Sequence, residues 1–245
     1  MNKKEKIKQI YENFSAEYYS DKFDNLREAL NIISKKEEKK FPHPLGRFII
    51  FYSFPTANPK LVIVGNNPSW FYKSKTATDD KGFNIAEKNL EDVAEKIPTV
   101  NSYREHDHKF GNQMIDIFNY CGKPEWIDTL VGLNRFFIQT GGGGTAELKK
   151  ECRKLDEANE NTYSEIESLC TYFTRELIDI LNPKLVILIG DDAKKSTFPD
   201  AEEYPRSYDE NRITFLEAIH PSNRNGGWIK TAKDIRNFME DNSLL

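Results

Sequence analysis

The chain carries the same apolar pattern twice. A proline and a lysine precede residues 61–65 (LVIVG), and the same two residues precede residues 185–190 (LVILIG). Runs that are apolar at every position, rich in β-branched residues and ended by glycine are typical of central parallel strands covered on both faces. The pattern therefore predicts an α/β fold.

Further segments alternate between strand and helix patterns. Two more strands are predicted within residues 130–140 and 213–219, and residues 48–52 form a strand-length run. Apolar side chains at helical spacing predict helices over residues 4–19, 23–40, 84–97, 112–121, 162–181 and 228–240. Such alternation favours a parallel sheet with right-handed crossovers. We expect a three-layer sandwich with a central, mostly parallel four-stranded sheet flanked by helices, plus N-terminal helices.

Composition limits the possible classes of protein. The 245 residues contain no Pro/Gly/Ser-rich linker, which predicts a single domain over 1–245, with an N-terminal helical extension at 1–45 and an α/β core at 46–245. No apolar run approaches the roughly 18 residues of a membrane span, and the first residues are polar, which predicts a cytoplasmic protein that uses no membrane. Three scattered cysteines exclude a disulfide framework or a four-thiolate metal site.

Charge argues against binding nucleic acid through the whole surface. The chain has 35 Lys and Arg against 39 Asp and Glu, a net charge of −4, whereas neutralising phosphates requires an excess of cations. Residues 220–236 are an exception, because this segment contains four basic residues and only one acidic residue, an Asp. One edge of the molecule is therefore expected to be basic.

The first polar loop to consider follows the strand at 61–65. It reads Gly65-Asn66-Asn67-Pro68-Ser69, which has the spacing of neither a dinucleotide-binding nor a phosphate-binding glycine loop. Pro68 restricts the backbone of Asn67, so the Asn67 carboxamide is held close to the strand end, where ligands bind in parallel sheets. The alternative is a turn in which Asn and Pro merely end the strand.

A second polar loop follows the last strand. It begins His220-Pro221-Ser222, so the imidazole is likewise held before a proline at a strand end. A histidine in that place can donate a hydrogen bond to developing negative charge. A structural histidine is the alternative for this loop taken alone.

Together the two loops resemble motifs one and two of the uracil-DNA glycosylase superfamily, over roughly residues 60–240. The resemblance implies that Asn67 positions a water and that His220 faces the base. The loop His220-Pro221-Ser222-Asn223-Arg224-Asn225 is most similar to that of the single-strand-selective monofunctional branch. By this resemblance Arg224 is the wedge that fills the gap left by an extruded nucleotide, and Ser222, Asn223 and Asn225 contact DNA beside it.

The resemblance also assigns a base pocket. Phe83 is the family-like stacking aromatic, with Trp70, Phe71 and Tyr72 as competitors and a core position as the alternative. Asn134 matches the base-reading asparagine, because a carboxamide donates and accepts; a solvated Asn at a strand end is equally compatible with the pattern. The remaining base-binding positions are Gly65, Asn66, Pro68 and Ser69.

These assignments predict a monofunctional DNA glycosylase of repair or antiviral defence. It would flip out uracil or another modified pyrimidine from single- or double-stranded DNA and hydrolyse the N-glycosidic bond, as a monomer without cofactor or metal. Ser69 departs from the glycine of the closest branch, and residues 141–144 are four glycines outside the family pattern. That run suggests a flexible lid or space for a bulky base, such as a modified cytosine of viral DNA.

Other readings stay open. A catalytically silent nucleic-acid-binding member of the fold, or a hydrolase of nucleoside or nucleotide N-glycosides, also fits the net charge of −4. The stretch His106-Asp107-His108 suggests a metal, although it has no third ligand at a typical spacing, and a solvated loop is favoured. Asp191 and Asp192 are expected to cap a helix rather than to form a catalytic pair.

Overall fold

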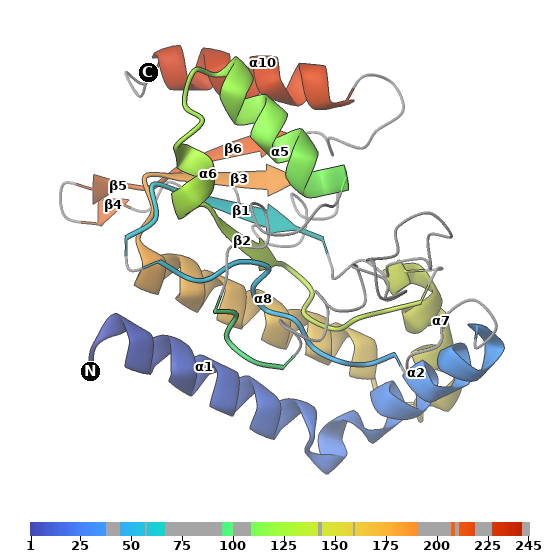
Figure 1. Ribbon diagram of the computed structural model, residues 1–245. Helices are drawn as coiled ribbons and strands as arrows, with labels where there is room; N and C mark the ends of the chain where they lie inside the picture. Colours follow the sequence, from blue (N-terminus) through green and yellow to red (C-terminus); the bar gives the residue numbers. More distant parts are fainter. Residues whose placement is uncertain are drawn as a thin grey trace, which may run out of the picture. The chain divides into compact units, whose positions relative to one another are not determined.

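The central element is a four-stranded parallel sheet. The structure is a computed structural model that describes residues 1–37, 45–56, 58–66, 95–99, 109–141, 144–158, 160–190, 207–208, 211–218 and 227–241. Strands β1 (Leu61–Gly65), β2 (Val131–Asn134), β3 (Leu185–Ile189) and β6 (Thr214–Ala218) pair in the order β2-β1-β3-β6, all parallel (Figure 1). The predicted fold class is confirmed: an α/β fold with a central parallel sheet flanked by helices, and with helices at the N-terminus.

The chain divides into two compact units. Unit 1 comprises residues 1–50, 67–97 and 136–177, and unit 2 comprises residues 51–66, 98–135 and 178–245. The division does not follow the boundary expected after residue 45, because the N-terminal helices belong to the same unit as segments from the middle of the chain. The prediction of one domain over 1–245 stays a prediction.

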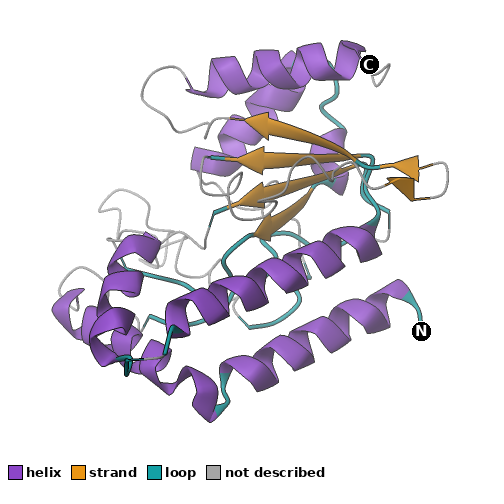
Figure 2. Cartoon of the chain, turned by 180° about the vertical axis from the view of Figure 1, so that it is seen from behind, coloured by secondary structure: helices purple, strands orange, loops and turns teal. Residues whose placement is uncertain are grey.

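Unit 2 contains the sheet and the helices that cover one of its faces. Alternate residues of β1 and β3 pack against α5 (Lys109–Tyr120), α6 (Trp126–Thr129) and α10 (Gly227–Asp241). Figures 1 and 2 show these helices and the sheet from two sides. Val62, Val64, Val186 and Leu188 are buried as well, and only Gly65 at the end of β1 is half-buried. Continuous apolar runs form these strands because both of their faces are covered.

The edge of β2 is covered by residues 51–53. Phe51 bridges antiparallel to Leu133, and the Tyr52 amide donates to the Gly132 carbonyl at 2.9 Å. The buried Ser53 hydroxyl accepts from the Gly132 amide at 3.1 Å and donates to the Leu130 carbonyl at 2.9 Å. These bonds pair polar backbone groups that a sheet edge otherwise leaves unpaired.

Two of the expected strands are shorter or divided. Of residues 130–140, only 131–134 join the sheet, while Ile138 forms an isolated antiparallel bridge with Phe48 in unit 1. The run at 48–52 is divided between the same two pairings, because Phe51 bridges to Leu133 in unit 2. The apolar content correctly predicted that these residues are buried. It did not show that they are divided between the two units.

Unit 1 is built from helices around an aromatic cluster. It contains α1 (Lys3–Tyr18), the short 3-10 helix η1 (Asp21–Phe23), α2 (Asp24–Glu37), α7 (Gly144–Leu155) and most of α8 (Thr162–Leu181). The fully buried Phe14 ring meets the rings of Phe48, Phe137 and Phe173 edge to face, with centroids 5.0 to 5.9 Å apart. Such pairs add to the stabilisation from burial alone.

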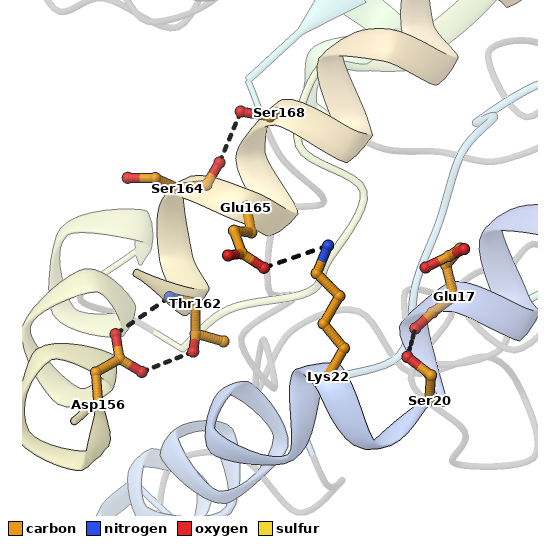
Figure 3. Close-up of polar contacts among 8 residues, drawn as sticks. All are labelled: Glu17, Ser20, Lys22, Asp156, Thr162, Ser164, Glu165 and Ser168. Atoms are coloured by element: carbon orange, nitrogen blue, oxygen red, sulfur yellow. Dashed lines mark hydrogen bonds and ion pairs between the residues drawn. The ribbon is translucent and has the colours of Figure 1, made fainter. Parts of the chain in front are cut away.

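Polar contacts fix the start of α8 (Figure 3). The Asp156 carboxylate accepts from the amide of Thr162 at 3.2 Å and from its hydroxyl at 2.6 Å. Lys22 forms an ion pair with Glu165 at 3.3 Å. The predicted helix over 162–181 is confirmed, and those over 4–19, 112–121 and 228–240 are confirmed within a few residues at their ends. The helix predicted over 23–40 is confirmed as far as Glu37, and residues 38–40 lie outside the described ranges.

Several local features differ from the expectations. Helix α7 and the two-residue strands β4 (Ser207–Tyr208) and β5 (Asn211–Arg212) were not predicted. The helix expected over 84–97 does not include Glu95, whose φ is +57°, and its residues before 95 lie outside the described ranges.

Gly141 is buried against α2. A Cβ added to this glycine would lie 2.9 Å from Ile33 and closer still to Glu37, so the glycine permits close packing with α2. Gly144 is the first residue of α7.

An ion-pair network between α2 and α7 predicts an acid-dependent part of the stability. Glu151 is 6% exposed and accepts from Lys36 at 2.8 Å and from Lys154 at 2.8 and 3.0 Å. Hydrogen bonds from Lys154 and then Lys36 lower the pKa of Glu151 to about 2. The unfolded chain therefore binds this proton at a higher pH than the folded chain. The stabilisation is complete above the ordinary carboxyl pKa and is lost as the pH falls toward about 2.

We expect Glu151→Gln to lower the Tm at pH 7, and we expect the difference in Tm from the unmodified protein to shrink below about pH 4.5. A constant difference across that range in thermal melts would contradict the network's role.

Candidate functional site

The candidate site lies at the carboxyl edge of the sheet. Gly65 at the end of β1 is in register with Asn134 at the end of β2, and Ile189 at the end of β3 is in register with Ala218 of β6. The amide of Gly190, whose φ is +88°, donates to the Ala218 carbonyl at 2.9 Å. All four strands therefore end side by side, which is where open parallel sheets bind their ligands.

Arg135 ties the end of β2 to the loop that follows β1. Its amide donates to the Gly65 carbonyl at 2.8 Å, and its Nε and Nη2 donate to Asn66 Oδ1 at 3.2 and 3.1 Å. Arg135 is only 2% exposed, and arginine is almost never buried unless it is paired. Three hydrogen bonds from Arg135 thus hold Gly65 and Asn66 in place.

The same contact orients the Asn66 side chain. A guanidinium only donates hydrogen bonds, so the carboxamide oxygen of Asn66 must face Arg135 and its nitrogen must face the other way. Asn66 is half-buried, and the neighbouring Asn134 is fully buried. The strand ends therefore carry two carboxamides and one guanidinium, a set that can read the donors and acceptors of a planar polar ligand.

The described residues include three of the predicted site positions. Gly65 and Asn134 are in register at the ends of neighbouring strands, and Asn66 directly follows Gly65. The other predicted positions lie outside the described residues: Asn67, Pro68, Ser69, Phe83, His220, Ser222, Asn223, Arg224 and Asn225. The strands that lead to the two motifs are described, and β1 and β6 flank β3 at this edge.

Arg135 is the residue that sequence reasoning missed. It follows Asn134 directly, in the otherwise apolar stretch VGLNRFFI at 131–138. A charged residue next to the predicted base-reading asparagine, inside a run of buried residues, was the available signal. The hydrogen-bond partner of Arg135 could not be predicted, because Asn66 is far away in the sequence.

The cysteines are not candidates for a nucleophile. All three are free and buried, and burial raises the pKa of the Cys121 thiol to about 11 and that of the Cys152 thiol to about 12. These two thiols stay protonated at neutral pH, whereas a thiolate is the reactive form. Within the described ranges no group of three or more His, Cys, Asp or Glu residues is placed to hold a metal ion, and the stretch at 106–108 lies outside them.

Comparison with models of protein families and with curated proteins finds no match to this chain. The resemblance to the uracil-DNA glycosylase superfamily therefore rests on the two motifs and their places after strands of a parallel sheet. In the part of the chain that the structure describes, no helix combines the length and apolar character needed to cross a membrane.

Proposed function

We propose that this protein is a monofunctional DNA glycosylase that acts on a modified base. The observation that carries the proposal is the carboxyl edge of the sheet, where Gly65, Asn66 and Asn134 meet and from which both motif loops depart. Asn67 comes two residues after β1, and His220 comes two residues after β6. Both motifs therefore begin at one edge, as an enzyme that acts on two sides of one nucleotide requires.

The proposed reaction is hydrolysis of the bond between C1′ of deoxyribose and the base. The base leaves with the electron pair of that bond, and a water oxygen forms the new bond to C1′ and releases its proton. In our proposal Asn67 orients the water, and His220 donates a hydrogen bond to the negative charge on the departing base. A carboxamide cannot take up a proton, so Asn67 does not act as a general base.

The remaining roles concern access to the base. Extruding a nucleotide costs a few kcal/mol, which stacking and hydrogen bonds to the base edge offset. Phe83 is proposed to stack on the base, Asn134 to read it and Arg224 to fill the vacated space. We further propose a monomeric, cytoplasmic enzyme; the free thiols of Cys121, Cys152 and Cys170 are typical of a reducing compartment.

The test is alkali-revealed strand cleavage on synthetic oligonucleotides, single- and double-stranded. The panel carries uracil, hypoxanthine, 5-hydroxymethylcytosine and glycosylated cytosine at one position. Release of at least one of these bases is the expected result, and cleavage of uracil alone would contradict the bulky-base version. Binding without release would instead indicate a silent member of the fold, and release from free nucleosides alone would indicate a nucleoside hydrolase.

Arg135 gives a second prediction, as a positioning residue. Arg135→Met removes both side-chain bonds to Asn66, and hydrogen bonds to charged groups contribute about 1.5–3 kcal/mol. We expect kcat for base release to fall by about 10- to 100-fold. Arg135→Lys keeps the charge but cannot direct two donor nitrogens at one oxygen. Its kcat should therefore lie between that of the unmodified protein and that of Arg135→Met.

A double-mutant cycle separates positioning from simple loss of stability. If Arg135 acts through Asn66, then Asn66→Ala combined with Arg135→Met should cost little more than either change alone. Additive losses in kcat would contradict positioning. Thermal melts of each variant control for unfolding, because truncating a buried arginine also removes packing.

A further inference from the structure

Unit 1 contains a pocket that the proposed function does not use. Its volume is about 200 Å³, and its polar lining comes from Tyr18 and Tyr19 at the end of α1, Arg27 in α2, Arg47 and Glu95. All of these residues are described and belong to unit 1. The volume is below the roughly 300–1,000 Å³ of sites for drug-sized ligands, so the pocket suits a single ring system.

A β-bulge sets the position of Arg47. The Gly46 amide donates to the Gln139 carbonyl at 3.2 Å, while the Gln139 amide donates to the Arg47 carbonyl at 2.8 Å. Gly46 and Arg47 therefore both lie opposite the single residue Gln139. Gly46 has a φ of +97°, which is the conformation of a glycine bulge. The Tyr18 hydroxyl donates to the Gly46 carbonyl at 2.6 Å and anchors the bulge. Bulges of this kind redirect a side chain, here that of Arg47.

The two arginines of the pocket differ in their partners. Arg27 is engaged, since its guanidinium donates to the carbonyls of Tyr18 and Ser20 and to Asp24. Arg47 is half-buried, and among the described residues no acceptor lies within hydrogen-bonding distance of its guanidinium. Arg47 therefore offers a planar set of donors to a ligand.

Glu95 supplies the opposite polarity from another wall of the pocket. Its amide donates to the Phe48 carbonyl at 2.8 Å, and its carboxylate accepts from the Tyr19 hydroxyl at 2.7 Å. Burial, followed by the bond to Glu95, raises the pKa of Tyr19 to about 12, so this hydroxyl remains a donor. Glu95 and Arg47 line one pocket, yet they are not among the ion pairs that the described residues form. The two side chains therefore line the pocket without pairing with each other.

Gln139, which lies opposite Arg47 across the bulge, has a side chain that is unpaired in the described part of the chain. Gln139 is 1% exposed, and neither its carboxamide nitrogen nor its oxygen has a hydrogen-bond partner within the described residues. Gln139 is not among the residues that line the pocket, so the proposed ligand site does not include it.

We propose that this pocket binds a guanine base. Arg47 pairs with two acceptors in the way that arginine reads guanine O6 and N7, and Glu95 accepts from N1–H and the 2-amino group on the other edge. Adenine fits less well, because it places an amino group where O6 would face Arg47. Tyr19, which is 50% exposed, supplies an aromatic surface beside the base. The base comes either from a free nucleotide or from a nucleic-acid strand.

Isothermal titration of the full chain tests this proposal. The ligands are dGMP, dAMP, dCMP, dIMP, inorganic phosphate, and an oligothymidylate with or without one central dG. We expect dGMP to bind at least 10-fold more tightly than dAMP or dCMP, and dIMP, which lacks the 2-amino group, to bind more weakly than dGMP. Preference for dGMP or for the dG oligonucleotide identifies the source of the base.

Arg47→Met and Glu95→Gln should each weaken dGMP binding by about 10-fold or more. Arg153→Met, at an exposed arginine of α7, is the matched control and should bind as the unmodified chain does. Equal binding of dGMP, dAMP and phosphate, no binding of either dGMP at millimolar concentration or the dG oligonucleotide, or unchanged binding by both pocket variants would overturn the proposal. Base release by the two variants should be unaffected, so this proposal and the glycosylase proposal fail separately.

Discussion

Replacing His220 by alanine is expected to slow base release by about 100- to 1,000-fold while the protein stays folded. The reason is that one preorganised donor to developing negative charge contributes roughly 2.7–4 kcal/mol to a transition state. Asn67→Ala should slow release by about 100-fold or more, because a misplaced water loses the advantage of orientation. Single-turnover cleavage of the best oligonucleotide of the panel measures both.

Matched variants make this result specific. His43→Ala and Asn31→Ala remove the same side chains at positions with no role in the proposed site and should leave release unchanged. Both catalytic variants should still bind the oligonucleotide, since most affinity comes from backbone contacts. Unchanged turnover in both His220→Ala and Asn67→Ala would refute the assignment of the two motifs.

Truncating Phe14 is expected to have the largest effect on stability. The ring is fully buried among Phe48, Phe137 and Phe173, and Phe→Ala in a core costs about 3–5 kcal/mol. Phe54→Ala is the matched control, because Phe54 is 46% exposed and such changes usually stay within about 0.5 kcal/mol. Urea unfolding followed by circular dichroism measures the two values.

The same experiment tests the domain prediction. Phe14 belongs to unit 1, whereas the sheet belongs to unit 2. If residues 1–245 form one cooperative domain, Phe14→Ala shifts a single transition seen by every probe. Two separate transitions, of which only one moves, would contradict the single-domain prediction.

The elements with a continuous or strictly periodic pattern were predictable. The strands β1 and β3 are apolar at every position, and α8 repeats its apolar residues at helical spacing over its whole length. In these segments local preference and burial agree, so neighbouring residues suffice to assign them. That the strands ending in Gly65 and Asn134 finish at the same edge agrees with the rule for open parallel sheets.

Segments whose partners are distant in sequence were not predictable in detail. Residues 130–140 read as one strand, but Ile138 pairs with Phe48 in unit 1 while Leu133 pairs with Phe51 in unit 2. Apolar side chains show that a segment is buried, but not which core buries it. The glycine run at 141–144 suggested a flexible lid or space for a bulky base, whereas Gly141 packs so closely that an added Cβ would lie 2.9 Å from Ile33 of α2.

The order of residues along the chain decided which segments are strands and helices, and which polar loops follow the strands, because both depend on near neighbours. The folded arrangement alone decided that Arg135 holds Asn66, that Arg47 and Gln139 share a bulge, and that Glu95 faces the same pocket as Arg47. Each of these pairs joins residues that are far apart in the chain. Their contacts are set by register, bulges and packing, which arise only when the whole chain has folded.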